Sequence, residues 1–132
     1  MTSGPTRSGA LLAAGAVVVL VSGCSSAERP EVERVATAFE DASGDARERC
    51  ELLTPQTLEQ LEEQLEKPCA EGIGDVPLEG GDVEGVEVWG GDAQVRLSDD
   101  TVFLTHTATG WRVAAAVCTP QAEGPYDCEV ES

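Results

Sequence analysis

The five cysteines of this 132-residue chain are the residues whose types and spacing offer the most chemistry. A cysteine can form a disulfide, bind a metal ion, act as a nucleophile or carry a covalent modification. No Cys-x-x-Cys pair occurs and the chain has a single histidine, so the spacing gives neither a zinc site nor a redox dithiol. Disulfides and a modification remain, and the odd count indicates that one cysteine differs from the rest.

The residues before Cys24 set this cysteine apart from the other four. Arg7 is the one charged residue of the segment that precedes it, and an apolar run extends from Ala10 to Val21. A run of about a dozen residues is too short to cross a hydrocarbon layer of roughly 30 Å, but it has the length of the apolar region of a signal peptide. The segment therefore predicts export from the cytoplasm.

The motif Val21-Ser22-Gly23-Cys24 resembles the lipobox of bacterial lipoproteins, in which an aliphatic residue, a small residue and Gly or Ala precede an obligatory cysteine. The resemblance implies that residues 1–23 are removed and that the Cys24 sulfur carries lipid, with residues 24–30 as a short tether. Two or more acyl chains, such as palmitate, attach a protein stably to a membrane. We therefore expect a lipid-anchored protein on the extracytoplasmic face of the cell membrane. The alternative is an ordinary secretory signal cut near Ala27, which would discard Cys24.

The remaining cysteines are even in number and, in an oxidising compartment, indicate a disulfide framework; they are Cys50, Cys69, Cys118 and Cys128. Four cysteines allow three pairings. We favour Cys50–Cys69 and Cys118–Cys128, because each pair flanks a turn that could bring its ends together. Each bridge would stabilise the fold by about 3 kcal/mol. That contribution matters because only 4% of the residues are aromatic.

The net charge of the chain argues against two classes of binding partner. The formal net charge is −17, which argues against nucleic acid and against electrostatic binding to anionic lipid. A run of glutamates falls in the segment between Cys50 and Cys69: Glu59, Glu62, Glu63 and Glu66. It is either the solvated face of a helix or an acidic surface for docking. A neighbouring envelope protein is the partner that such a surface would suit.

Periodicity divides the mature chain into helices followed by strands. Pro30 is expected at the first helical position, and apolar residues recur at helical spacing in Val32, Val35, Ala36, Phe39 and Ala42. A second helix is expected over 46–53 and a third from Thr54-Pro55 to Lys67-Pro68, with a loop over 72–81. Strands are expected over 83–89, 93–97, 101–107, 111–118 and 126–130.

This order of elements predicts an α+β domain over residues 31–130, with N-terminal helices packed on a curved antiparallel sheet of four to five strands. In the fourth strand, one face should carry Trp111, Val113, Ala115 and Val117. The stretches CELLTPQTLEQLEEQLEKPC and TVFLTHTATGWRVAAAVCTP resemble small actinobacterial lipoproteins with an NTF2-like (cystatin-like) domain. That resemblance implies a cone-shaped sheet.

The sequence contains no hydrolase, metalloprotease, phosphate-loop or dinucleotide-binding motif, and it gives no reason to expect a cofactor or a metal. We therefore expect a non-enzymatic accessory or binding module at the membrane surface. One alternative is a small-molecule carrier with an apolar pocket on the concave face of the sheet. Another is an isomerase or cyclase centred on His106. The candidate pocket residues are Trp89, Phe103, His106 and Trp111.

Overall fold

The computed structural model, which describes residues 2–5, 9, 15 and 24–132, begins its folded part with one long helix, α1 (Cys24–Glu40). The predicted apolar face of this helix is confirmed, since Val32, Val35 and Phe39 are completely buried. Two predictions are wrong: Pro30 lies inside the helix, and Ala42 lies exposed beyond its end. The helix begins at Cys24, before its apolar face, and none of residues 25–30 is buried.

Three short helical segments and a longer one follow. They are α2 (Ala46–Glu51), α3 (Pro55–Leu65), α4 (Cys69–Gly72) and the 3-10 turn η1 (Ile73–Asp75). The predicted cap of α3 is confirmed: Thr54 accepts a hydrogen bond from the backbone N–H of Thr57, and Pro55 occupies the first turn. Residues 72–75, expected in a loop, belong instead to α4 and η1.

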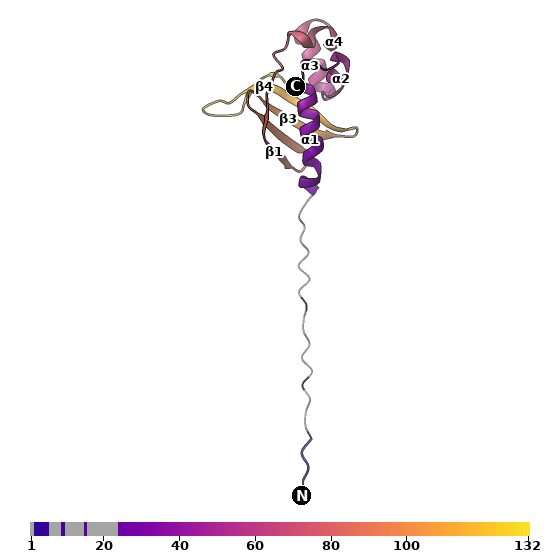
Figure 1. The fold of residues 1–132 in the computed structure, drawn as a ribbon, viewed down its shortest axis with the longest axis vertical. Coiled ribbons are helices and arrows are strands. Elements are labelled where there is room, and N and C mark those ends of the chain that lie inside the picture. Colours follow the sequence, from indigo (N-terminus) through magenta and orange to yellow (C-terminus); the bar gives the residue numbers. More distant parts are fainter. Residues whose placement is uncertain (1, 6–8, 10–14, 16–23) are drawn as a thin grey trace.

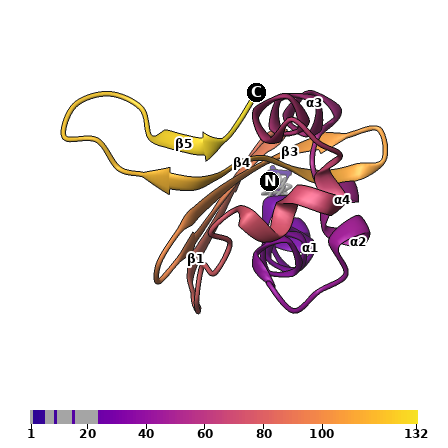
Figure 2. The ribbon, with the colours of Figure 1, turned by 90° about the horizontal axis from the view of Figure 1, so that it is seen from above.

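Five antiparallel strands form a meander in the order β1-β2-β3-β4-β5. Their bounds are β1 (Val83–Trp89), β2 (Asp92–Leu97), β3 (Thr101–Thr107), β4 (Gly110–Thr119) and β5 (Asp127–Val130). Helix α1 packs against β1 to β4, whereas α3 contacts β4 and β5. Figure 2 shows β5 and its long connecting loop on the side away from α1, and α3 lies on that side as well. The α+β class with helices on an antiparallel sheet is therefore confirmed.

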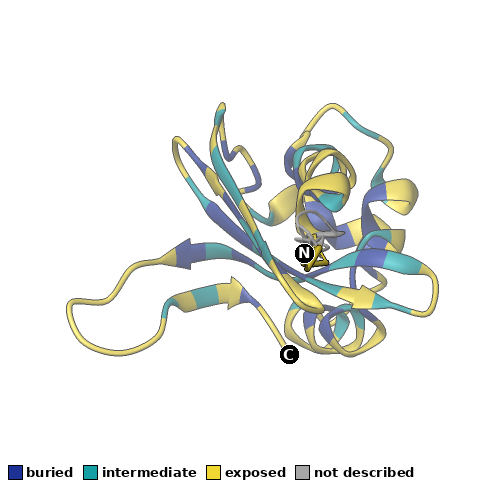
Figure 3. Cartoon of the chain, turned by 90° about the horizontal axis from the view of Figure 1, so that it is seen from below, coloured by how far each residue is buried: buried dark blue, intermediate teal, exposed yellow. Residues whose placement is uncertain are grey.

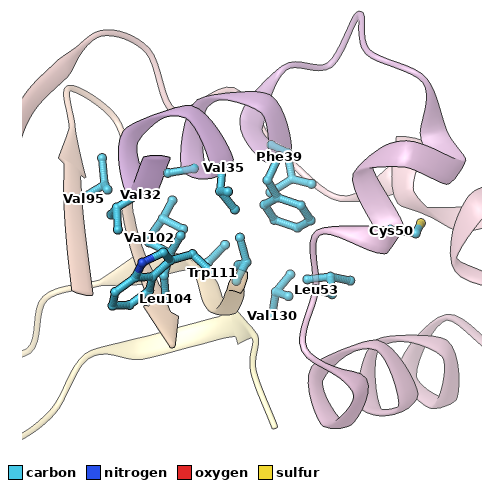
Figure 4. Close-up of a cluster of buried hydrophobic side chains, with 14 of the residues drawn as sticks. Val32, Val35, Phe39, Cys50, Leu53, Val95, Val102, Leu104, Trp111 and Val130 are labelled. Carbon is cyan, nitrogen blue, oxygen red and sulfur yellow. The ribbon is translucent and has the colours of Figure 1, made fainter. Parts of the chain in front are cut away.

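The core lies between α1 and the sheet. Trp111 and Phe39 are its largest fully buried side chains, and valines and leucines from β2, β3 and β4 fill the space around them. Figure 4 shows Trp111 packed among Val102, Leu104 and the side chains of α1. Along β2, β3 and β4, buried residues alternate with more exposed ones (Figure 3). The other helical segments and β5 also contribute buried residues to this core: Cys50, Leu61, Cys69, Ile73 and Val130.

A bulge in β4 changes which of its residues face inward. Phe103 pairs with Ala115 whereas Leu104 pairs with Val113, so Ala114 is an extra residue in the ladder. The strict alternation predicted for this strand is consequently wrong beyond Val113: Ala116 and Cys118 are buried in place of Ala115 and Val117. The segment before α3 pairs at the same place, through an isolated bridge between Leu53 and Val113.

Candidate functional site

The predicted site of lipid attachment, Cys24, is the first residue of α1. The signal-peptide prediction falls largely on residues outside the described part of the chain, including Val21 to Gly23, and the Cys24 side chain is also outside it. Residues 24–30, expected as a tether, form the start of α1. Figure 1 shows this start at one end of the fold and α2, α3 and α4 at the opposite end. No helix within the described ranges is long and apolar enough to cross a membrane.

Both predicted disulfides are present. Cys50 of α2 is bonded to Cys69 at the start of α4, so the bridge spans the whole of α3. Cys118 and Cys128 face each other across β4 and β5 and are bonded there. The first bridge fixes the two ends of the α3 segment, and the second holds the edge strand β5 on the sheet.

The four candidate pocket residues do not lie together. Trp111 is buried in the core, and the exposed ring of His106 contacts its edge, with the two ring centres 5.2 Å apart. Phe103 instead contacts Tyr126, with ring centres 5.1 Å apart. Trp89 is 50% exposed. The concave face of the sheet, where a carrier would need an apolar pocket, is occupied by the side chains of α1.

The predicted glutamate run flanks a shallow groove along α3. Pro55 and Leu58 supply its apolar surface, and Glu59, Glu62 and Glu63 supply its carboxylates, around a volume of about 430 Å³. Glu62 has a structural task as well, because its carboxylate accepts a hydrogen bond of 2.7 Å from the backbone N–H of Cys69. Glu59 and Glu63 are exposed, and the Glu63 carboxylate accepts a hydrogen bond of 3.4 Å from the side chain of Gln60. The groove therefore offers apolar contact edged by negative charge.

A buried threonine attaches the first turn of α3 to the sheet. The Thr57 side chain is completely buried, and its hydroxyl donates a hydrogen bond of 2.9 Å to the carbonyl of Ala114, the extra residue of the β4 bulge. Thr54 stands 2.7 Å from the same hydroxyl, oxygen to oxygen, and its backbone N–H donates to the carbonyl of Val113. The groove is thus carried by a helix whose first turn is fixed to the sheet.

A second acidic region surrounds the C-terminal end of α1. Glu40, the last residue of the helix, is 6% exposed, and neither of its carboxyl oxygens accepts a hydrogen bond of good geometry. Burial, and after it the hydrogen bond and negative charge of Asp100, raise the pKa of Glu40 to about 9. The backbone of Gly80 and the charge of Arg49 oppose this rise. Glu40 is therefore protonated at neutral pH.

The neighbours of Glu40 are themselves fixed by backbone groups. Asp100 accepts hydrogen bonds of 2.7 to 2.8 Å from the backbone N–H groups of Thr101, Val117 and Cys118. Arg49 is 5% exposed and donates its Nε–H to the carbonyl of Phe39 at 2.9 Å, at the end of α1. Burial lowers the pKa of the Arg49 guanidinium, and the charges of Glu40 and Asp41 act in the opposite direction.

The spacing of residues in the sequence does not predict this cluster. Asp100 falls between the strands expected over 93–97 and 101–107, a position typical of a turn residue. A signal for Glu40 does exist: it follows Ala36 by four residues and so falls on the apolar face of α1. The sequence contains no comparable signal for Arg49, whose burial depends on how α2 packs against the end of α1.

Comparison with known proteins identifies no relative. No protein-family model matches the chain, and neither the search of curated proteins nor the search of solved structures gave a significant match.

Proposed function

We propose that this protein is a lipid-anchored, non-enzymatic binding module that uses the acidic groove of α3 to dock a basic segment of an envelope protein. The lipid would be attached at Cys24 after removal of residues 1–23, on the extracytoplasmic face of the cell membrane. The finer description of the fold as an NTF2-like (cystatin-like) cone, of the kind found in small actinobacterial lipoproteins, belongs to the same proposal.

The observation that carries the proposal is the position of the groove. It lies on α3, at the end of the fold opposite the start of α1 (Figure 1), so a protein held at Cys24 would direct it away from the membrane. Leu58 and Pro55 provide apolar area, which favours association, and the carboxylates of Glu59 and Glu63 select a positively charged partner. The net charge of −17 adds a long-range attraction for the same kind of partner.

The two disulfides support an extracytoplasmic location, because such bonds persist in oxidising compartments. The carrier and the isomerase or cyclase alternatives find less support. The concave face is filled by core side chains, and the one ring contact of His106 in the described structure is with Trp111.

The test is site-specific photo-crosslinking in the native membrane. A photoreactive residue replaces Glu59 in the groove, and the matched control replaces Glu87, which is also exposed but lies on β1. We expect a discrete crosslinked protein from position 59 and none from position 87. With the photoreactive residue kept at position 59, the charge reversal Glu63→Lys should weaken the same product.

Two controls separate the anchor from the groove. Mass spectrometry of the mature N-terminus should show an acylated Cys24, and Cys24→Ala should release the protein from the membrane fraction. An unmodified N-terminus near Ala27 would contradict the anchoring part alone. Crosslinking that is equal at positions 59 and 87, or insensitive to the charge reversal, would contradict the docking part alone.

A further inference from the structure

The two disulfides differ in how far their sulfur-bearing residues are exposed to solvent. Cys50 and Cys69 are both buried, being 7% and 2% exposed, and the helix between them is attached to the sheet by Thr57. Cys118 is also buried, whereas its partner Cys128 is partly exposed. A thiolate must reach a sulfur atom in order to attack a disulfide, so access is one of the factors that set the rate of exchange. A reductant in solution therefore reaches the second bridge, at Cys128, more readily than the first.

Cys128 lies on β5, the shortest strand of the sheet and one of its two edges. Val130 is the one buried residue of this strand. Residues 120–125, in the loop before β5, and residues 131–132, after it, are exposed (Figure 3). A short edge segment with few buried contacts opens at a lower free energy than the central strands of a sheet. We therefore expect β5 to be able to separate from β4 while the core between α1 and the other strands stays closed.

Few contacts other than the disulfide hold the segment 120–132 on the sheet. Tyr126 contacts Phe103, with ring centres 5.1 Å apart, and the side chain of Val130 is 1% exposed. The segment contains no lysine or arginine but has four acidic residues: Glu123, Asp127, Glu129 and Glu131. In a chain with a net charge of −17, these residues favour departure of the segment from the rest of the domain. The disulfide is thus a principal link between β5 and β4.

We propose that Cys118–Cys128 is a site of thiol–disulfide exchange, at which a reduced dithiol releases β5 while the rest of the domain stays folded. The class of reactant is a dithiol such as the Cys-x-x-Cys pair of a thiol oxidoreductase. Cys50–Cys69 does not react in the folded protein, because both of its cysteines are buried. The exchange depends neither on a lipid at Cys24 nor on the α3 groove.

The exchange moves two electrons and two protons from the dithiol to the protein. One thiol of the reductant loses its proton and attacks Sγ of Cys128, which forms a mixed disulfide and expels Cys118 as a thiolate. The second thiol loses its proton and attacks the reductant sulfur of this mixed disulfide, which expels Cys128 and leaves the reductant as a disulfide. Each released cysteine takes up one proton.

Release of β5 would uncover part of the outer edge of β4. The residues of β4 that lose their partners are Ala116, Cys118 and Thr119. Val113, on the same strand, keeps its backbone hydrogen bonds to Leu52 and Thr54. The reduced protein would therefore present a short strand edge of the kind to which another extended chain can add.

The experiment measures the rate at which each bridge is reduced in the full-length mature protein, in detergent micelles with excess dithiothreitol. Samples are quenched with acid and alkylated, and peptide mass spectrometry assigns the free thiols. We expect Cys118 and Cys128 to become free about tenfold faster than Cys50 and Cys69. Low concentrations of urea should leave the faster rate unchanged and raise the slower one, because only the buried bridge requires an opening of the fold.

The product reduced at Cys118–Cys128 alone should keep the near-ultraviolet circular dichroism of the buried Trp111, with faster hydrogen exchange in β4 and β5. Tyr126→Ala, which removes the ring contact with Phe103, should speed reduction of this bridge several-fold and leave Cys50–Cys69 unchanged. Trp89→Ala is the matched control, because Trp89 is an exposed aromatic residue on β1, and it should alter neither rate.

Three results would overturn the proposal. They are equal rates for the two bridges or a faster release of Cys50 and Cys69, the same urea dependence of both rates, and loss of the Trp111 signal in step with reduction of Cys118–Cys128.

Discussion

At the scale of single residues, Glu40 is a group whose ionisation opposes folding. In the unfolded chain its pKa is the usual 4.5, whereas burial beneath Gly80 and the neighbouring Asp100 raise the pKa to about 9 in the folded protein. Between these two values the folded state holds a proton that the unfolded state has lost. The free energy of unfolding therefore falls as the pH rises from about 4.5 to about 9.

Glu40→Gln should remove this dependence, because glutamine keeps a neutral side chain that can donate to Asp100. At pH 7 the variant should be more stable than the native protein by roughly 3 kcal/mol, and near pH 4 the two should be about equally stable. Urea unfolding followed by circular dichroism at several pH values measures the difference. A native protein whose stability is flat from pH 5 to pH 9 would show that Glu40 ionises normally.

At the scale of the elements, the position of α3 in the fold is set by its hydrogen bonds to the sheet as well as by its own sequence. Its cap at Thr54 and its approximate bounds could be predicted from the sequence. Its attachment was not, because Thr57 bonds to Ala114, a partner far along the chain that becomes available only at the β4 bulge. Alternation predicts a regular strand from Trp111 to Cys118 and does not predict the extra residue Ala114 in the ladder.

The exchange Thr57→Val, which preserves shape, should lower the free energy of unfolding by about 1–3 kcal/mol, because the partly buried carbonyl of Ala114 then loses its donor. Denaturant unfolding measures this cost. Thr37→Val is the matched control: the Thr37 hydroxyl bonds only to carbonyls of its own helix, so this change should have a small effect. Equal effects of the two substitutions would mean that the link from α3 to β4 adds nothing to stability.

At the scale of the whole molecule, both disulfides and the helix-on-sheet arrangement follow from cysteine spacing, helical periodicity and strand alternation. The sequence is less informative about the charged interior. Charged residues are usually exposed, so nothing in their spacing predicts that Arg49 and Glu40 lie buried where α1, α2 and the β2–β3 turn meet. The predicted pocket does not form for a different reason. Its residues, Trp89, Phe103, His106 and Trp111, do not gather at one place, because residues at strand spacing divide between the two faces and the ends of a sheet.

The two disulfides should raise the free energy of unfolding by similar amounts, but each should stabilise a different part of the fold. Replacing Cys50 and Cys69 by serine, or Cys118 and Cys128, should each lower the free energy of unfolding by about 3 kcal/mol. Hydrogen exchange should separate them: loss of the first bridge should speed exchange in α2, α3 and α4, and loss of the second in β4 and β5. Faster exchange in α3 after loss of the second bridge alone would contradict this division.

The uninterrupted helix from Cys24 into the core has a consequence for orientation. An α-helix turns by about 100° for each residue. With a lipid on Cys24, the number of residues between that cysteine and Val32 sets the rotational phase of the whole domain about the helix axis. A single inserted alanine between Ala27 and Glu28 would leave every internal contact of the sheet intact. It would nevertheless swing the α3 groove around the axis, so that a partner embedded in the same membrane would meet a different side of the protein.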